Sequence, residues 1–293
     1  MSANKDQHFV PEGHLKRFAV DKKIFVTKVE DCKEFMENIE KIAYIKYGYS
    51  SDPALKNSFE KVLSSLEDYL IKPVDKILNG CSGNSDDKPI IFYYMAMLQA
   101  RSLDIMSNIE DKKQILKLNI DSRNIHFDYF VQLGIWNVCE KPYEYYDVYL
   151  VRSNGSKEFI TSDCPVVETD AKIALKNCSD DEISSGDEGG DSNIVLCPLS
   201  SQHCGILTKK NSENKYVRTV LNVAEHPEFI VDIANGHVIY RAVEDVYSKN
   251  GAKELVKSVS VHFQHPEKER KKVNLKNRRK IGKNKIASTR PKE

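Results

Sequence analysis

Two histidines stand near the start of the chain, in a run that also contains a proline and several apolar residues. His8 is followed three residues later by Pro11, and His14 lies six residues after His8. The apolar residues of run 7–18 predict that the N-terminus packs on the core instead of fraying. Histidine gains or loses a proton near neutral pH. His8 is therefore a candidate acid–base residue, whereas His14 is expected at the surface.

An aspartate stands where a predicted strand ends. Asp163 follows the run 159–161 and precedes Pro165, which restricts the backbone before it. A carboxylate held in this way could bind a metal ion, orient an imidazole or act as a base. The alternative is an Asx turn that caps the end of the strand, and the sequence favours this structural interpretation.

Two polar residues interrupt the apolar segment 90–98 at its C-terminal end. Gln99 and Arg101 are two positions apart, so only one of them is expected to point inward from a helix. A buried arginine needs a carboxylate, and Asp163 and Glu60 are the expected partners. The pair would lock the helices to the sheet, or the guanidinium would anchor a phosphate or carboxylate ligand.

Paired carboxylates also occur on a predicted long helix. Glu60 and Glu67 lie two helical turns apart. At this spacing they could share a divalent metal ion or divide acid and base roles. A solvated helix face is the commoner explanation of helical glutamates. The sequence thus allows a divalent metal ion as a cofactor and does not identify the ion.

The charge of the chain is unevenly distributed. Residues 268–293 contain twelve Lys or Arg and two Glu, a net charge of +10, which leaves −9 on the rest because the whole chain carries +1. We predict a disordered basic tail over 267–293 that binds nucleic acid or a protein partner. Its candidate contact residues are Lys271, Lys272, Arg278, Arg279 and Lys280.

Composition points to a globular protein of the cytoplasm. No apolar run approaches the ~20 residues of a membrane span, and the N-terminus lacks the apolar stretch of a secretory signal. The seven cysteines include no close CxxC pair, which is typical of free thiols in a reducing compartment. We expect no membrane partner.

Apolar periodicity predicts the elements that must position these residues. The whole pattern predicts an α+β fold with a largely helical N-terminal half, packed on a small, mostly antiparallel sheet from the C-terminal half. One domain spans 1–266 and contains a disordered acidic loop at 177–193. The expected helices are 32–48, 54–78, 89–106, one or two within 112–138, 217–233 and 246–256; the expected strands are 23–29, a hairpin of 146–151 with 158–161, 193–199, 204–208 and 238–240.

The order of these motifs resembles the mainly bacterial domain-of-unknown-function family DUF4238. The resemblance covers roughly residues 7–247 and depends on the runs His8-Phe9-Val10-Pro11, Phe59-Glu60, Leu98-Gln99-Ala100-Arg101 and Ser162-Asp163-Cys164-Pro165, followed by a late apolar helix. It implies that His8, Glu60, Gln99, Arg101 and Asp163 converge in one site. The long acidic insertion after Cys178 departs from the family pattern.

Two functions are compatible with these residues. The first is a phosphodiester hydrolase, a nuclease-like effector of a bacterial defence or toxin type. In it His8 is the acid or base, Asp163 and Glu60 bind a metal or orient the histidine, and Arg101 stabilises phosphate charge. The second is a non-catalytic module that binds nucleic acid or protein and whose buried polar network specifies the fold.

Overall fold

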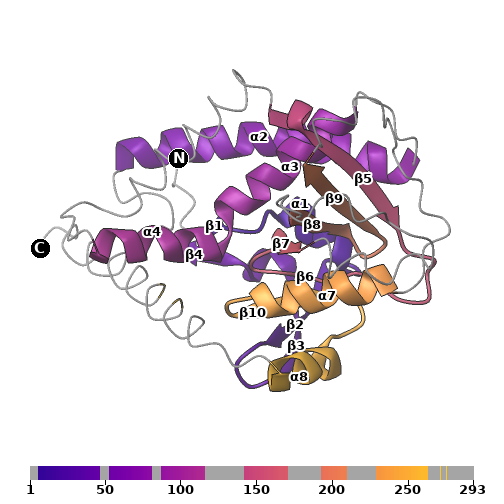
Figure 1. The fold of residues 1–293 in the computed structure, drawn as a ribbon. Helices are drawn as coiled ribbons and strands as arrows, with labels where there is room; N and C mark the ends of the chain where they lie inside the picture. The colour runs from indigo at the N-terminus through magenta and orange to yellow at the C-terminus, as the bar shows by residue number, and fades with distance from the viewer. Residues whose placement is uncertain are drawn as a thin grey trace, which may run out of the picture.

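The computed structural model of the chain describes residues 6–46, 53–80, 87–115, 142–170, 193–209, 229–262, 271 and 275. The described residues form an α+β fold with three antiparallel sheets (Figure 1). The smallest sheet pairs β1 (Asp6–His8) with β4 (Tyr44–Lys46). This pairing holds the N-terminus in place, as its apolar residues predicted.

Strands occur in both halves of the chain, so the prediction of a sheet formed only by the C-terminal half is wrong. The expected helix 32–48 is instead β3 (Glu34–Asn38), the 3-10 turn η2 (Ile39–Lys41) and β4. Ile39, Ile42 and Ile45 are buried, whereas Phe35 and Met36 are exposed. Ala43 has a φ of 53°, which an L-residue in a right-handed helix does not adopt. The three-residue spacing of the isoleucines thus reflects their burial and not a helical turn.

The second sheet joins the two ends of the described chain. Its strand order is β3, β2 (Lys23–Lys28), β10 (Asp245–Ser248) and β6 (Thr161–Ser162). The expected hairpin of 146–151 with 158–161 is therefore wrong, because β6 pairs with β10. The side chain of Asn235 in α7 (Phe229–Arg241) bonds to the backbone of this segment: its Oδ1 accepts from Ile160 N at 3.0 Å, and its Nδ2 donates to Glu158 O at 2.9 Å.

The third sheet has the order β5, β9, β8, β7, with all neighbours antiparallel. The strands expected at 146–151, 193–199 and 204–208 are confirmed as β5, β8 and β9. The bounds are β5 (Tyr146–Arg152), β9 (His203–Lys209), β8 (Asn193–Ser200) and β7 (Val167–Asp170).

Long helices flank these sheets. The bounds are α2 (Pro53–Gly80), α3 (Asp87–Arg101), α4 (Leu103–Ile115), α7 (Phe229–Arg241) and α8 (Lys253–His262). The expected helix 54–78 is confirmed as α2, whereas the expected helix 89–106 is wrong in its extent, because α3 ends at Arg101 and α4 begins at Leu103. The expected strand 238–240 lies in α7, and the expected helix 246–256 begins as β10. Short apolar runs do not separate buried helices from strands. The remaining short elements are α1 (Glu12–Leu15), η1 (Lys16–Phe18) and η3 (Pro142–Tyr145).

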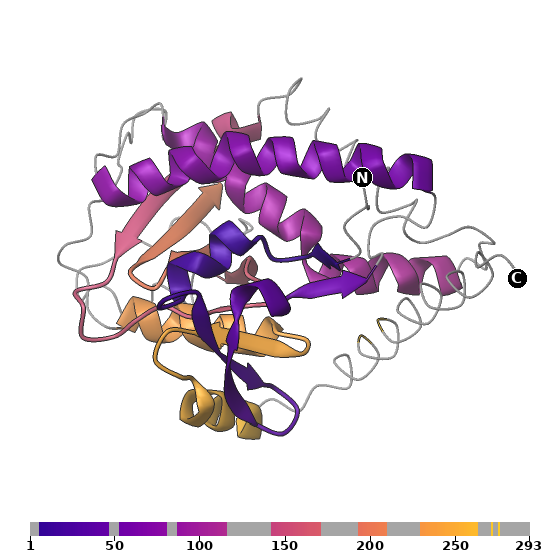
Figure 2. The same cartoon turned by 180° about the vertical axis from the view of Figure 1, so that it is seen from behind.

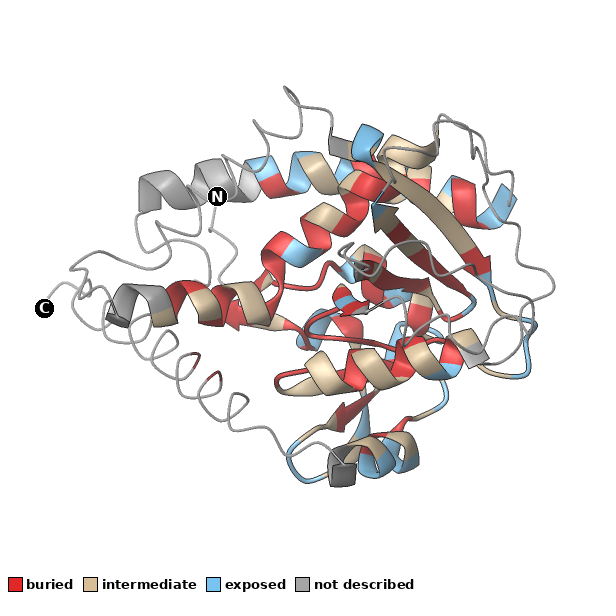
Figure 3. Ribbon diagram, viewed as in Figure 1, coloured by how far each residue is buried: buried red, intermediate tan, exposed pale blue. Residues whose placement is uncertain are grey.

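Buried residues gather where α3 packs on β5 and β9, and on the inner side of α7 (Figure 3). Tyr94, Met95 and Leu98 of α3 are fully buried. β9 approaches this helix closely because residue 205 is glycine: a Cβ there would lie 3.0 Å from the sulfur of Met95. Seen from behind, the indigo N-terminal elements lie against the other side of α3 (Figure 2). The first helix, α1, thus lies directly against α3.

Several predictions fall outside the described residues. These are the acidic loop 177–193 except Asn193, the helix 217–233 before Phe229, and the segment 116–138. Of the basic tail, the structure describes Lys271 and Leu275. Among the described helices, none is both long and apolar enough to cross a membrane.

Candidate functional site

His8 lies at the end of β1, where the chain turns into α1. Its Nε2 is 3.1 Å from Oε1 of Glu12, and its side chain is 14% exposed. Tyr44 on the paired strand presents its ring edge to the imidazole, with 5.9 Å between centroids. Pro11 directly precedes α1. Glu12, the first residue of this helix, therefore lies four residues after His8 and within reach of its ring. The arrangement is a surface-accessible imidazole with a carboxylate partner, which is suited to proton transfer.

Arg101 is buried at the end of α3 and joins three elements. Its Nη1 donates to the Glu67 carboxylate on α2, and its Nη2 donates to the main-chain carbonyl of His8 on β1. Gln99 is exposed, so the prediction that one of the two residues points inward is confirmed. The carboxylate partner is Glu67, not Asp163; the side chain of Glu60 lies outside the described residues. Glu67 lies two helical turns after Glu60 on the same helix, and of these two glutamates only Glu60 was predicted as a partner of Arg101.

Asp163 is completely buried and bonds to the backbone between α7 and β10. Its Oδ1 accepts from Val243 N at 2.9 Å, and its Oδ2 accepts from Glu244 N at 2.5 Å and Asp245 N at 2.9 Å. Burial and the charge of Asp245 raise the pKa of Asp163 to about 7, although its three hydrogen bonds from backbone N–H groups lower this pKa. Both oxygens thus serve as a cap for residues 243–245, which is the kind of structural role that the sequence favoured.

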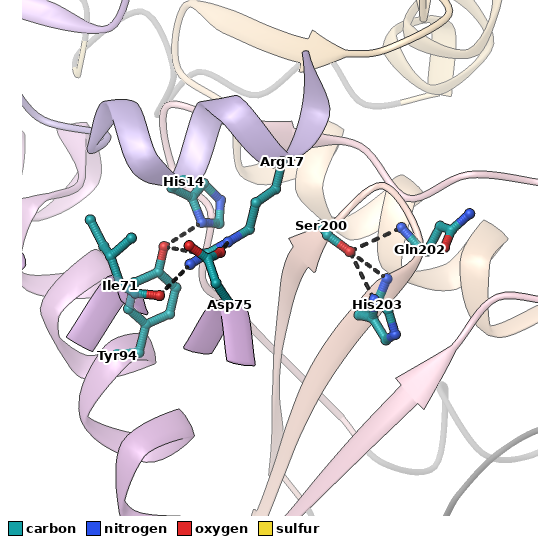
Figure 4. A network of polar contacts seen from close by, with 8 residues as sticks. All are labelled: His14, Arg17, Ile71, Asp75, Tyr94, Ser200, Gln202 and His203. Atoms are coloured by element: carbon teal, nitrogen blue, oxygen red, sulfur yellow. Dashed lines mark hydrogen bonds and ion pairs between the residues drawn. The ribbon is translucent and has the colours of Figure 1, made fainter. Parts of the chain in front are cut away.

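His14, expected at the surface, is completely buried, so that expectation was wrong (Figure 4). Its Nδ1 is 3.0 Å from Oη of Tyr94, and its Nε2 is 3.1 Å from Oγ1 of Thr161. Burial and the nearby Arg17 charge hold the pKa of His14 well below its usual range. The imidazole is therefore neutral at pH 7 and connects α1 to α3 and β6.

Arg17 completes this network from η1 (Figure 4). It donates from Nε to Asp75 at 2.7 Å, from Nη1 to Tyr94 Oη at 2.7 Å and from Nη2 to Ile71 O at 3.1 Å. Because Tyr94 Oη accepts from Arg17, its own proton can go to Nδ1 of His14, whose Nε2–H then donates to Thr161. Burial raises the pKa of Tyr94, so the hydroxyl keeps its proton. This chain of hydrogen bonds cross-links helices and sheet; it is fully buried at His14 and Tyr94 and reaches solvent at Asp75, which is 49% exposed.

Two further histidines, to which the sequence assigned nothing, have structural partners. His203 Nδ1 is 3.0 Å from Ser200 Oγ in the β8–β9 turn, and burial lowers the pKa of His203 to about 4. His237 Nε2 is 2.9 Å from Thr169 Oγ1, and burial lowers its pKa as well. Both imidazoles are neutral at pH 7 and stabilise the local contacts of their elements.

Of the predicted tail contacts, Lys271 is the one that the structure describes. Its Nζ is 2.5 Å from Oδ1 of Asp104 on α4, and its side chain is 8% exposed. Lys271 is therefore engaged with the body of the protein. Lys272, Arg278, Arg279 and Lys280 lie outside the described residues.

The structure brings together part of the predicted site. Arg101 joins His8 and Glu67, and the carbonyl of Asp163 accepts from Leu103 N at 3.2 Å, two residues after Arg101. The carboxylate of Asp163 faces residues 243–245 instead. Within the described part of the chain, no group of three or more His, Cys, Asp or Glu side chains could hold a metal ion.

Comparison with known proteins returns one family. A family model described as "Protein of unknown function (DUF4238)" matches residues 6–252. No curated protein matches the chain, and no solved structure matches it. The function must therefore be argued from the geometry of the chain itself.

Proposed function

The chain belongs to the DUF4238 family, whose description assigns no activity, and we propose from its own residues that it is a nucleic-acid-binding protein without catalytic activity. In this proposal the body is a rigid support, and its buried polar side chains specify the fold. The basic residues after Leu275 bind the phosphate backbone.

The backbone bonds of Asp163 carry the non-catalytic part of this proposal. Each carboxylate oxygen accepts at least one main-chain N–H, and the side chain has no exposed surface. A base or metal ligand needs a lone pair directed at the substrate or ion. Arg101 is also buried and bonded to Glu67 and to the His8 carbonyl. Both residues are thus placed to hold elements together.

The distribution of charge supports a polyanionic partner. The body is acidic overall, and its like charge would repel a nucleic acid. Lys271 and Leu275 are buried against the body, so we assign binding to the residues that follow them. Residues 276–293 contain eight Lys or Arg and one Glu, a net charge of +7. Binding through such a segment is independent of sequence and depends strongly on salt.

The test compares the full chain with a chain that ends at Leu275, using a fluorescein-labelled single-stranded DNA of ~20 nucleotides. If all seven net charges neutralise phosphates, the affinity of the full chain should fall on the order of a thousandfold between ~50 and ~200 mM salt. The shortened chain should keep its melting temperature and lose this binding. Equal affinity of the two chains at low salt would remove the segment 276–293 from the proposal.

A matched variant of the full chain tests three of these basic residues together. Replacement of Arg278, Arg279 and Lys280 by Gln removes three positive charges. The slope of log affinity against log salt should then become about 2 shallower, at ~0.7 per phosphate contact on a single strand. An unchanged slope would mean that these three residues do not touch phosphate.

One observation favours a second candidate, hydrolysis of a phosphodiester at His8. This imidazole is partly exposed and is paired with Glu12, so it could transfer a proton with Glu12 fixing its tautomer. Arg101 would position it through the main chain. His8→Gln should keep the fold, because Arg101 bonds to the carbonyl of His8 and not to its ring.

The same variant separates the two candidates. In the binding proposal, the wild-type chain leaves labelled DNA, labelled RNA and bis(4-nitrophenyl) phosphate intact, and His8→Gln binds DNA as the wild type does. In the hydrolase proposal, the wild type cleaves one of them, and His8→Gln and Glu12→Gln lose that activity without a change in melting temperature.

A further inference from the structure

The dipeptide Asn-Gly occurs four times in the chain, and the fold places the four pairs in different surroundings. In such a pair the backbone nitrogen of the glycine can attack the side-chain amide of the asparagine, because glycine has no side chain to hinder the approach. Two pairs lie in helices, and two lie in connections between elements. The helical pairs are Asn79-Gly80 in α2 and Asn235-Gly236 in α7; the other two are Asn154-Gly155 after β5 and Asn250-Gly251 before α8.

The side chain of Asn154 is folded back over its own backbone. Its Oδ1 accepts from Ser156 N at 3.0 Å and from Ser156 Oγ at 2.6 Å. Because this oxygen bonds to the nitrogen two residues later, the side chain bends over the peptide bond that joins Asn154 to Gly155. The amide carbon of Asn154 therefore lies beside the nitrogen that would attack it. Residues 154–156 are exposed, so water reaches the whole turn.

The hydrogen bonds of this turn favour the attack. The two donors on Oδ1 of Asn154 withdraw electron density from the amide carbon and stabilise the negative charge that develops on this oxygen. Gly155 N donates to Ser153 Oγ at 3.1 Å, and Ser153 Oγ donates to the carbonyl of Lys157. Gly155 has a φ of +92°, and nothing lies within 4 Å of its Cβ position. The turn therefore orients the nitrogen and leaves room for a ring to close.

The other three pairs are held in ways that oppose the same reaction. Asn235 is 5% exposed, and its amide bonds to Ile160 N and to Glu158 O, away from the next peptide. In both helical pairs, the i→i−4 hydrogen bonds also fix the position of the glycine nitrogen. Asn250 donates from Nδ2 to Glu158 Oε2 at 2.7 Å, so a carboxylate holds the group that would have to leave.

We propose that Asn154 is a site of spontaneous modification, at which the fold directs ring closure with Gly155 and converts the asparagine to aspartate and isoaspartate. The nitrogen of Gly155 forms a bond to Cγ of Asn154, the bond from Cγ to the amide nitrogen breaks, and the proton of Gly155 leaves with that nitrogen as ammonia. Water then opens the succinimide ring at either carbonyl. The co-reactant is water, and nothing is oxidised or reduced. This inference does not depend on nucleic-acid binding.

Both products change the turn chemically. Each adds a carboxylate at position 154, close in sequence to Lys157, whose Nζ pairs with Asp232 at 2.5 Å. Opening of the ring at the backbone carbonyl gives isoaspartate, in which the main chain runs through the former side chain. The contacts of Ser153 and Ser156 with this turn then lose their register.

The experiment follows all four asparagines in one sample of the full-length chain. The folded chain is kept in H₂¹⁸O at pH 8, and peptide mass spectrometry with chromatography separates asparagine, aspartate and isoaspartate at each position. Ser156→Ala removes the Oγ donor to Asn154. Ser258→Ala, which changes an exposed serine of α8, is the matched control. A sample unfolded in urea gives the rates that the local sequence alone produces.

The expected result is specific to one asparagine. In the folded chain, Asn154 should react on the order of tenfold faster than each of the other three and yield both aspartate and isoaspartate. Ser156→Ala should slow Asn154 alone, by about threefold, because water replaces the lost donor only in part. Ser258→Ala should match the wild type, and the four rates should become similar in urea.

Three results would overturn the proposal. Equal rates of the four asparagines in the folded chain, or a difference that persists in urea, would show that the fold does not select Asn154. An unchanged rate in Ser156→Ala would show that the donors on Oδ1 do not promote the attack. Aspartate as the sole product would indicate direct hydrolysis of the amide and not ring closure with Gly155.

Discussion

Asp163 holds the connection between α7 and β10 through both of its carboxylate oxygens. In Asp163→Asn, an NH₂ group replaces one acceptor and faces a main-chain N–H. We expect the free energy of unfolding at pH 8 to fall by about 3 kcal/mol, because a buried donor loses its partner. Urea denaturation measures this change.

Asp232→Asn is the surface control for that substitution. Asp232 is 53% exposed, and its ion pair with Lys157 lies in solvent. Exposed pairs contribute little, so the change should stay within about 0.5 kcal/mol. If the two variants had equal stability, Asp163 would not be the residue that fixes this connection.

The buried imidazole of His14 makes stability depend on pH. Its pKa in the folded state is lowered, so the unfolded chain binds the extra proton below about pH 6.5. The contribution of the neutral His14 imidazole to the free energy of unfolding is fully present above about pH 6.5 and is lost as the pH falls. Asp163 acts in the opposite direction, because its raised pKa favours the folded state as the pH falls from about 7 to about 4.

The His14 contribution can be isolated by comparison with His14→Gln. The difference in unfolding free energy between wild type and variant removes the terms of Asp163 and His203. This difference should be constant above pH 7 and should shrink by about 1.4 kcal/mol per pH unit below pH 6.5. A difference that is constant from pH 8 to pH 5 would mean that His14 is not held neutral.

For single residues, local spacing in the sequence predicted which side chain is buried. Contacts between residues far apart in the sequence could not be predicted. The two-residue separation of Gln99 and Arg101 allowed only one inward side chain, and this was confirmed. His14 could not be placed, because its partners Tyr94 and Thr161 lie 80 and 147 residues away. No local pattern in the sequence reports that pairing.

The contact between β9 and α3 depends on a glycine. A Cβ on Gly205 would meet Met95 at 3.0 Å and Leu199 at 3.3 Å, and both side chains are buried. Gly205→Ala should therefore destabilise the protein by about 1–3 kcal/mol through overpacking. Gly236→Ala in α7 is the control: nothing lies within 4 Å of its Cβ position, and alanine favours helix by about 0.5–1 kcal/mol. Thermal unfolding that ranks Gly205→Ala at or above Gly236→Ala would contradict this packing.

Elements with long, regular periodicity were predicted well. The stripe of α2 extends over many turns, and the sequence placed this helix within two residues of its observed ends. Short elements failed for a physical reason. In residues 34–46, two strands and a 3-10 turn bury isoleucines at three-residue spacing, which imitates a helix. The α7 segment 238–240 failed in the reverse direction, because a short apolar run does not distinguish a helix from a strand.

Over the whole molecule, the sheet order depends on contacts between the ends of the chain. β10 lies between β2 and β6, which brings residues 25–28 beside residues 245–248. The α+β class follows from composition and periodicity, and it was predicted. The placement of strands in both halves follows from this long-range pairing. The spacing of apolar residues within a short stretch of sequence carries no information about such a pairing.

Arg101 gives the most direct test of the claim that the polar cluster holds the body together. It connects α3 to α2 and β1 through Glu67 and the His8 carbonyl. In Arg101→Met, Glu67 and this carbonyl lose their partner. The free energy of unfolding, measured by urea denaturation, should fall by about 3 kcal/mol, with the affinity for single-stranded DNA unchanged. Wild-type stability together with lost DNA affinity or lost hydrolysis would contradict the account, because Arg101 would then serve a ligand and not the fold.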